Sequence, residues 1–106
     1  GYWDYTGNLY VPLNVSADSF TDRTKWFEGN ALDEVANVTG NVVGLDHSSL
    51  SPFMCKDVKV IVDDKEEIEK GRDLGATITV LTCAVQDLIK MLGALTKRVE
   101  ALEKKA

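Results

Sequence analysis

The hydrophobic positions in the last third of the chain repeat at alternating spacings of three and four residues. This is the heptad pattern of a coiled coil, in which apolar residues at positions a and d form a seam along one side of a helix. We expect one long helix from about Thr77 to Lys105. A lone helix cannot bury such a seam, so the pattern predicts that the chain binds copies of itself. The a positions, followed by the d positions, are Ile78, Val85, Leu92, Val99, Leu81, Leu88, Leu95 and Leu102.

The same positions bear on how many helices join. β-Branched residues at a with Leu at d favour two helices. Three features favour three: Leu92 stands at an a position, and Ile89 and Met91 widen the apolar face at positions e and g. The third is the segment Arg-Val-Glu-Ala-Leu-Glu, which resembles the trimerisation motif of short coiled coils. That resemblance implies pairing of Arg98 at g with Glu103 at e of the adjacent chain. We therefore predict a parallel homotrimer, with a dimer as the alternative.

The start of this helix departs from the pattern. Val80 falls at c and Cys83 at f, which point outward in a coiled coil. An apolar patch on the outer face at one end predicts that something covers it, and we expect the chain's own N-terminal part to fold back there. Beyond Gln86 the outer face becomes polar, so we expect the rest of the coil to project uncovered.

Residues 1 to about 30 are rich in aromatic side chains. Strands are expected at Tyr2–Tyr5 and Leu9–Leu13, with Thr6-Gly7-Asn8 as the turn. We expect the aromatic residues to form a small core, because aromatic side chains dominate cores generally. Exposure for contact with a partner, with Trp3 and Tyr5 as candidates, is the alternative. The aromatic residues are Tyr2, Trp3, Tyr5, Tyr10, Phe20, Trp26 and Phe27.

The middle of the chain mixes helix, strand and loop signals. Residues 31–36 are expected to form a short helix capped by Asn30, and residues 40–52 an irregular segment. The β-branched run Val58–Val62 predicts a strand. Asp64 with Glu67 three residues later matches a capping box and predicts helical turns over residues 65–70. Gly71 and Gly75 would then form a break or hinge.

These patterns predict an α+β fold, with a small aromatic-rich β domain followed by a long C-terminal helix that forms a parallel trimeric coiled coil. The predicted divisions are a head over residues 1–62, a capped turn and glycine hinge over 63–76, and the coiled-coil helix over 77–106.

Charge and composition restrict the partners. The 106 residues carry a net charge of −5, whereas nucleic-acid binding needs a basic surface. No uninterrupted apolar run approaches the roughly 18 residues of a membrane span, so membrane insertion is not expected. Cys55 and Cys83 belong to no C-x-x-C pair, and we expect free thiols, with a disulfide as the alternative. Asn14 and Asn37 begin glycosylation sequons.

The chain offers no arrangement typical of an active site. Its one histidine, His47, lies in the segment Leu-Asp-His-Ser-Ser. A Ser/His/Asp set among sequence neighbours is not a catalytic triad, because triad members come from separate parts of a fold. We interpret the segment as a polar loop and predict no catalytic residue, no cofactor and no metal. An enzyme is the weakest of the function classes considered.

Aromatic and acidic residues in the first 26 positions follow a recognisable spacing. Leu9-Tyr10-Val11, followed by Phe20, Asp22 and Trp26, resembles small modules of bacteriophage fibre and head-fibre proteins. Those modules pair a Tyr-x-Ala/Val strand with a later Phe-x-Asp-x-x-x-Trp strand; here Pro12 departs from the pattern. The resemblance implies a homotrimeric structural protein of the virion, assembled in the host cytoplasm. It would attach to a capsid or tail protein, or present a tip to the host cell surface.

The alternative is an ectodomain fragment of a viral or cellular envelope glycoprotein with a coiled-coil stalk. In that class the two sequons would carry glycans and the cysteines would be paired. Glycan mass and a count of free thiols distinguish the two classes.

Overall fold

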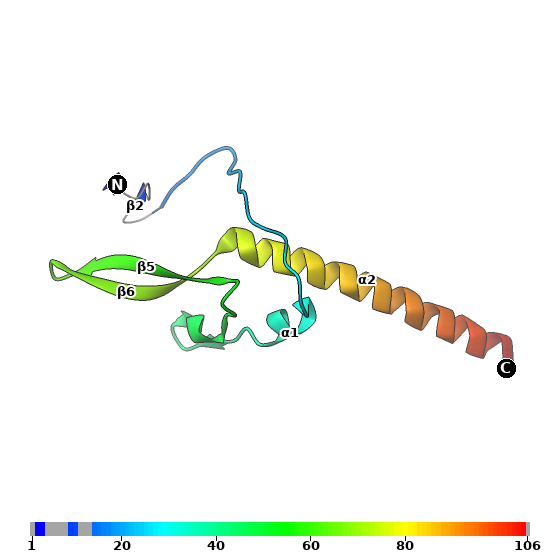
Figure 1. The fold of residues 1–106 in the computed structure, drawn as a ribbon. Helices are drawn as coiled ribbons and strands as arrows, with labels where there is room; N and C mark the ends of the chain where they lie inside the picture. The colour runs from blue at the N-terminus through cyan, green and yellow to red at the C-terminus, as the bar shows by residue number, and fades with distance from the viewer. Residues whose placement is uncertain (1, 4–8, 11–13, 106) are drawn as a thin grey trace.

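The computed structural model describes residues 2–3, 9–10 and 14–105 and has the predicted α+β architecture (Figure 1). Small antiparallel sheets come first, and a single long helix ends the chain. The elements are β1 (Tyr2–Trp3), β2 (Leu9–Tyr10), α1 (Ala31–Ala36), β3 (Gly40–Asn41), β4 (Gly44–Leu45), the 3-10 helix η1 (His47–Ser49), β5 (Cys55–Val62), β6 (Lys65–Arg72) and α2 (Leu74–Lys105).

β1 and β2 form the expected N-terminal hairpin. They pair antiparallel, with Tyr2 opposite Tyr10 and Trp3 opposite Leu9. The predicted turn at residues 6–8 and Tyr5 lie outside the described residues, as do residues 11–13. The hairpin prediction is therefore confirmed for the two described strand segments.

Residues 14–28 form an extended strap that runs from the N-terminal hairpin to α1. No strand forms there, so the second strand of the fibre-type module, expected around residues 20–26, is absent. The prediction of an aromatic core is wrong for two of the three aromatic side chains described in the strap. Phe20 is 72% and Trp26 59% exposed, whereas Phe27 is buried and packs against Phe53 with ring centroids 5.1 Å apart. An irregular strap buries only the side chain that meets the head, and here that is Phe27.

α1 confirms the predicted short helix and its cap. The Asn30 side chain accepts a hydrogen bond from the Asp33 amide, which satisfies one of the free N–H groups of the first turn. After α1, β3 and β4 make a short hairpin with two residues in each strand, and η1 follows. The expected irregular stretch thus contains only these small elements. The Asp46 side chain accepts from the Ser48 amide at the start of η1.

β5 and β6 correct the predicted helix over residues 65–70. The segment is a strand, and it pairs along its whole length with β5, from Cys55 opposite Arg72 to Val62 opposite Lys65. Asp63 and Asp64 connect the strands, with φ values of 51° and 62°. A two-residue turn with both φ positive matches the twist of a hairpin, and Asp tolerates that conformation. Asp63 and Asp64 therefore make a turn and not a helix start. The hinge assigned to Gly71 is a strand position.

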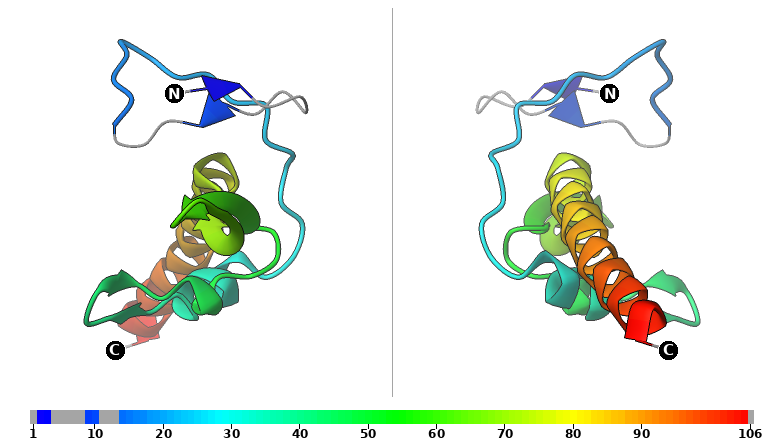
Figure 2. Two further views of the ribbon diagram at one scale, coloured as in Figure 1. Left: turned by 90° about the vertical axis from the view of Figure 1, so that its left-hand side faces the viewer. Right: turned by 90° about the vertical axis from the view of Figure 1, so that its right-hand side faces the viewer.

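α2 spans 32 residues, about 48 Å at 1.5 Å per residue. It begins three residues before the predicted start at Thr77 and ends where expected. The core lies between α1 and the first half of α2. Its buried members are Phe27, Ala31, Leu50, Met54, Val80 and Ala84. The views from the two ends show the strap passing beside α2 on its way to α1, which lies against another side of the helix (Figure 2).

Candidate self-association surface

The a and d side chains of α2 are all exposed in the single chain. Their exposed fractions run from 43% for Val99 to 66% for Leu102. Soluble monomers rarely leave a continuous apolar surface of this length open to water. We call this surface the seam, and it includes the predicted residues Ile78, Leu81, Val85, Leu88, Leu92, Leu95, Val99 and Leu102.

The seam extends one position further toward the N-terminus than the sequence pattern suggested. Leu74, seven residues before Leu81, also stands at a d position and is 63% exposed. Extending the heptads backward by one position finds Leu74, but the hinge predicted at Gly71 and Gly75 placed the start of the helix after it. The seam therefore begins at the first residue of α2.

A second apolar stripe of α2 is covered by the chain itself. Ala76, Val80 and Ala84 are spaced by four residues and are the buried side chains of α2. Val80 is fully buried, and Cys83 packs at the edge of the same cluster. α1 and the residues that precede β5 supply the covering side chains. This confirms the prediction that the outward-facing apolar patch at the top of the helix is covered by an earlier part of the chain.

The two stripes lie on different sides of one helix. At 100° per residue, the first two heptads of the seam are centred roughly 120° around α2 from Val80. Since the covering side chains pack around Val80 and the seam residues stay exposed, the seam is free to meet another helix. Beyond Asp87 every described residue of α2 is exposed, which confirms that the lower part of the helix projects uncovered.

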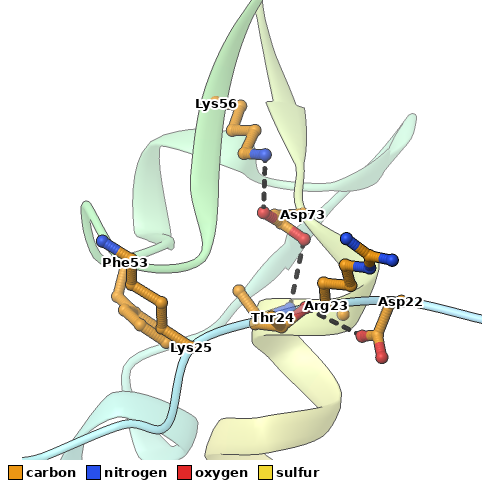
Figure 3. A pocket seen from close by; sticks show the side chains of 9 residues that line it. Asp22, Arg23, Thr24, Lys25, Phe53, Lys56 and Asp73 are labelled. Atoms are coloured by element: carbon orange, nitrogen blue, oxygen red, sulfur yellow. Dashed lines mark hydrogen bonds and ion pairs between the residues drawn. The ribbon is translucent and has the colours of Figure 1, made fainter.

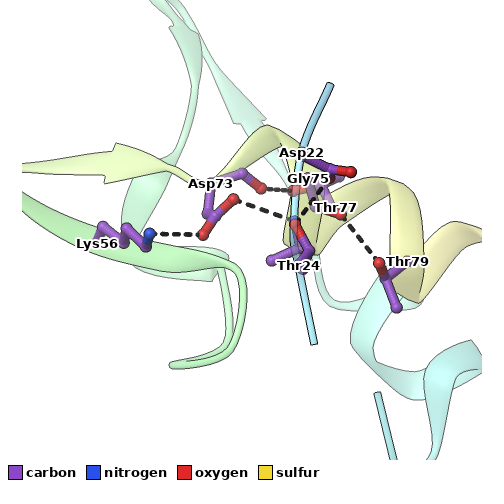
Figure 4. A network of polar contacts seen from close by, with 8 residues as sticks. Asp22, Thr24, Lys56, Asp73, Gly75, Thr77 and Thr79 are labelled. Carbon is purple, nitrogen blue, oxygen red and sulfur yellow. Dashed lines mark hydrogen bonds and ion pairs between the residues drawn. The ribbon is translucent and has the colours of Figure 1, made fainter. Parts of the chain in front are cut away.

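The strap fixes the start of α2 at Gly75. A Cβ atom there would overlap the Thr24 hydroxyl and the Asp22 carboxylate, so a larger residue would push these two side chains of the strap aside. The Thr24 hydroxyl donates to Asp22 at 2.8 Å, and Figure 4 shows both beside the first turn of α2. Gly75 is therefore a contact point of the strap, which corrects its assignment to a hinge.

Asp73 caps α2 and links it to β5. Its carboxylate accepts from the Ala76 amide at 3.1 Å and meets the Lys56 ammonium at 3.1 Å (Figure 4). The Ala76 hydrogen bond, assisted by Lys56, holds the pKa of Asp73 below its ordinary value, although partial burial acts in the opposite direction. Asp73 thus stabilises the first turn of the helix as an anion.

The other predicted contact residues have different outcomes. Arg98 and Glu103 lie on the exposed lower part of α2. The ion pairs among the described residues are Lys56–Asp73 and Lys70–Asp57, so neither Arg98 nor Glu103 is engaged within its own chain. Trp3 lies in β1, Tyr5 is outside the described residues, and both stay candidates only.

A depression with a volume of about 540 Å³ lies between the strap and the start of α2 (Figure 3). Two of its charged groups have partners, Lys56 with Asp73 and Asp22 with the Thr24 hydroxyl. Arg23 and Lys25 of the strap also line it. His47 lies in η1. The neighbouring Asp46 carboxylate accepts hydrogen bonds from the Ser48 amide and hydroxyl and not from His47. Among residues 14–105 and the two short strands, no group of three His, Cys, Asp or Glu side chains is placed to hold a metal ion.

Cys55 and Cys83 are both free and half-buried. Each packs at the edge of the same core cluster, and the Cys83 thiol lies 3.7 Å from the Phe27 carbonyl oxygen. The expectation of free thiols is confirmed.

α2 is, by length and composition alone, also apolar enough to cross a membrane. The chain has no uninterrupted apolar run as long as a membrane span, but the mean hydropathy of the first part of α2 is as high as that of such spans. Burial covers 17% of that stretch.

Comparison of the chain with protein-family models, with curated proteins and with solved structures finds no match.

Proposed function

We propose that this protein is a structural component of a bacteriophage particle that assembles as a parallel homotrimer through α2. The helices form the shaft, and the head with its N-terminal hairpin attaches to a capsid or tail protein or contacts the host surface. The observation that supports this proposal is the division of α2 into a stripe covered by its own chain and a seam left open.

Two features of the open seam favour helices as its partner. Its heptad spacing holds from Leu74 to Leu102, which is the period that meshes with identical helices. Since a straight helix drifts about 20° per heptad against that period, the helices would wind into a left-handed supercoil. The exposed Arg98 and Glu103 are placed at g and e, where an Arg fork can pair with a carboxylate of the next chain.

Lipid is a poorer partner for the same helix. α1 packs on the first half of α2, and a bilayer would have to displace it or take in its polar backbone ends, which lipid cannot hydrogen-bond. Asp87 and Lys90 stand in the middle of the helix, and charged side chains are costly inside a bilayer. A helix bundle leaves both residues in water.

The envelope-glycoprotein reading is the second candidate, and one observation favours it. Asn14 and Asn37, the acceptor residues of the two sequons, are both exposed. The free state of Cys55 and Cys83 does not support it, because extracellular domains of this size commonly pair their cysteines. Glycan mass on protein from a eukaryotic secretory host would support this second candidate.

Replacing Leu88 and Leu95 with Asp tests the seam. Two carboxylates at adjacent d layers would be buried without partners in every helix, so sedimentation should show single chains. The matched control is Gln86→Asp with Gly93→Asp, which has the same seven-residue spacing and introduces the same two residues at outward b positions. A Cβ at Gly93 meets nothing within 4 Å, so the control should remain trimeric.

The attachment role needs a separate test. Purified trimer added to phage particles that lack it should co-sediment with the capsid or the tail, and the seam variant should not. A seam variant that stays trimeric contradicts the assembly claim. A wild-type trimer that binds neither particle nor host cell contradicts the virion role and leaves the assembly claim intact.

A further inference from the structure

A second depression opens between the start of α1 and the middle of α2, with a volume of about 520 Å³. Its large apolar side chains are Leu32, which is half-buried against the core, and Met91, which is 58% exposed. Its lining residues are Gly29, Asn30, Leu32, Asp87, Lys90 and Met91. The depression is therefore a partly apolar hollow that the chain itself leaves open, at the lower edge of the head.

The depression lies on the g side of the seam. In the heptads of α2, Ala84 and Met91 stand at successive g positions. Ala84 is 4% exposed because it belongs to the core cluster that the head covers, and Met91 lines the depression one heptad further along. Thr82 and Ile89, at the neighbouring e positions, are exposed. The head therefore borders the seam along its g side and leaves the e side open.

The e side carries one large apolar side chain, at the level of the depression. The e positions of the seam hold Thr82, Ile89, Thr96 and Glu103. Ile89 is 63% exposed, although e positions are commonly polar or charged. At 100° per residue it lies roughly 160° around α2 from Met91. Ile89 therefore cannot reach the depression of its own chain, and its burial needs another copy.

A parallel bundle brings Ile89 to the depression of the adjacent copy. The predicted ion pair joins Arg98 at g to the e residue five positions later on the adjacent chain, Glu103. The same offset, taken two heptads earlier, joins Ala84 to Ile89 of the adjacent chain. Because side chains of a helix lean toward its N-terminus, that Ile89 side chain would lie beside the turn between Ala84 and Met91, which is the edge of the depression.

We propose that Ile89 of each copy packs into the depression between α1 and α2 of the adjacent copy, against Leu32 and Met91. A second copy is the occupant because the depression is continuous with the seam at Met91, and the heptad register brings this one apolar e residue to it. Each copy then uses two unlike surfaces, its e side and its g side with the head, as a closed ring of copies requires. The inference rests on the proposed assembly through α2 and adds the head to that interface.

Chemical cross-linking tests whether the two surfaces meet. In a chain with Cys55→Ala and Cys83→Ala, the substitutions Leu32→Cys and Ile89→Cys place one thiol on each surface. A short bis-maleimide should then give covalent trimers on a denaturing gel, because every chain is linked to both of its neighbours. The matched control pairs Leu32→Cys with Thr96→Cys, which lies on the same e side about 10 Å further along the helix, and should give single chains.

A double-mutant cycle measures the same contact without added thiols. Ile89→Ala should weaken association by about tenfold or more per chain, because burial of an isoleucine contributes at least that factor. Part of this loss comes from the neighbouring helix, so Leu32→Ala measures the share of the head. The loss in the double variant should be smaller than the two single losses combined. Val35→Ala, on α1 but outside the depression, is the control, and its loss should add to that of Ile89→Ala in sedimentation equilibrium.

Sedimentation separates the failure of this inference from failure of the assembly. If the variant with Leu32→Cys and Ile89→Cys is a trimer but yields only single chains after cross-linking, Ile89 does not reach the depression and the inference is wrong. Covalent trimers in the Thr96→Cys control alone would place the helices in another register and refute it as well. Additive losses for Leu32→Ala and Ile89→Ala would refute the contact. If the wild type is a single chain, the proposed assembly fails and this inference with it.

Discussion

The upper and lower halves of α2 share one heptad pattern but stand in opposite surroundings. In the upper half, Ala76, Val80 and Ala84 are buried by the chain's own head. In the lower half, every described residue beyond Asp87 is exposed. The small buried residues, spaced by four, let α1 approach α2 closely. The larger seam residues run along the whole of α2, so burying them needs another long helix. One helix thus carries two kinds of interface, and the predictions below separate them.

Replacing Met54 with Ala should disturb the upper interface most. Met54 is 1% exposed in the core cluster, and such a deletion leaves a cavity that costs about 2–5 kcal/mol. Hydrogen exchange of α1 should rise sharply, while exchange over residues 92–102 and the trimer mass stay unchanged. Phe20→Ala, at a 72% exposed position, is the control and should have little effect. If hydrogen exchange in Met54→Ala rises equally in both halves of α2, the two halves unfold together and do not form independent interfaces.

Gly75→Ala should have an effect opposite in sign to Gly93→Ala. The first places a methyl group against the strap and should cost about 1–3 kcal/mol. The second meets open space and should stabilise the helix by about 1 kcal/mol. Urea unfolding at fixed protein concentration measures both. If Gly75→Ala also stabilises, the strap does not cross the helix at that point.

The Asp73 cap predicts a dependence on pH confined to the upper half. Because its folded pKa is lowered, its stabilising effect is complete above the unfolded value of 3.8 and is lost as pH falls through the folded pKa. Asp73→Ala should cost about 1 kcal/mol at neutral pH. Asp73→Asn keeps a capping oxygen and should remove this part of the acid dependence. An unchanged acid profile in Asp73→Asn would exclude the carboxylate as its source.

Arg98→Ala should have the smallest effect, and only in the lower half. An exposed interchain ion pair is worth about 0.2–1 kcal/mol, so the trimer should loosen slightly or include dimers. Lys97→Ala, at the neighbouring outward position, is the control. Sedimentation equilibrium over a range of salt concentrations measures the difference, which should shrink as salt screens the pair. If Arg98→Ala and Lys97→Ala have the same association constant at low salt, the predicted Arg98–Glu103 pairing is wrong.

The sequence predicted those elements in which local and long-range signals agree. The helix after Asn30 has its cap and its acidic first turn, and α2 has a period that only a helix satisfies. It misplaced residues 65–72, because Asp64 and Glu67 fit a helix start as well as a hairpin turn. Pairing with Val58–Val62 decided between them, and that pairing is a long-range contact. The alternation of valines before two aspartates was the signal for the turn.

The candidate surface was predictable in part, because the heptad spacing is a local pattern that needs no knowledge of long-range contacts. The a and d positions from Ile78 to Leu102 followed from spacing alone, and so did the covered patch at Val80 and Cys83. Leu74 was missed because a glycine hinge was predicted beside it. The aromatic core was not predictable, because burial of Phe27 and exposure of Phe20 and Trp26 depend on where an irregular strap meets the head. The depression between α1 and α2 became visible only with the packing of the two helices.

The central claim is that the open seam of α2 joins three copies of the chain. The most direct measurement is the solution mass of the unmodified protein by light scattering at micromolar concentration. The account predicts three times the mass of one chain. Two chain masses would keep the seam but refute three-fold assembly, and a stable single chain would contradict the account altogether.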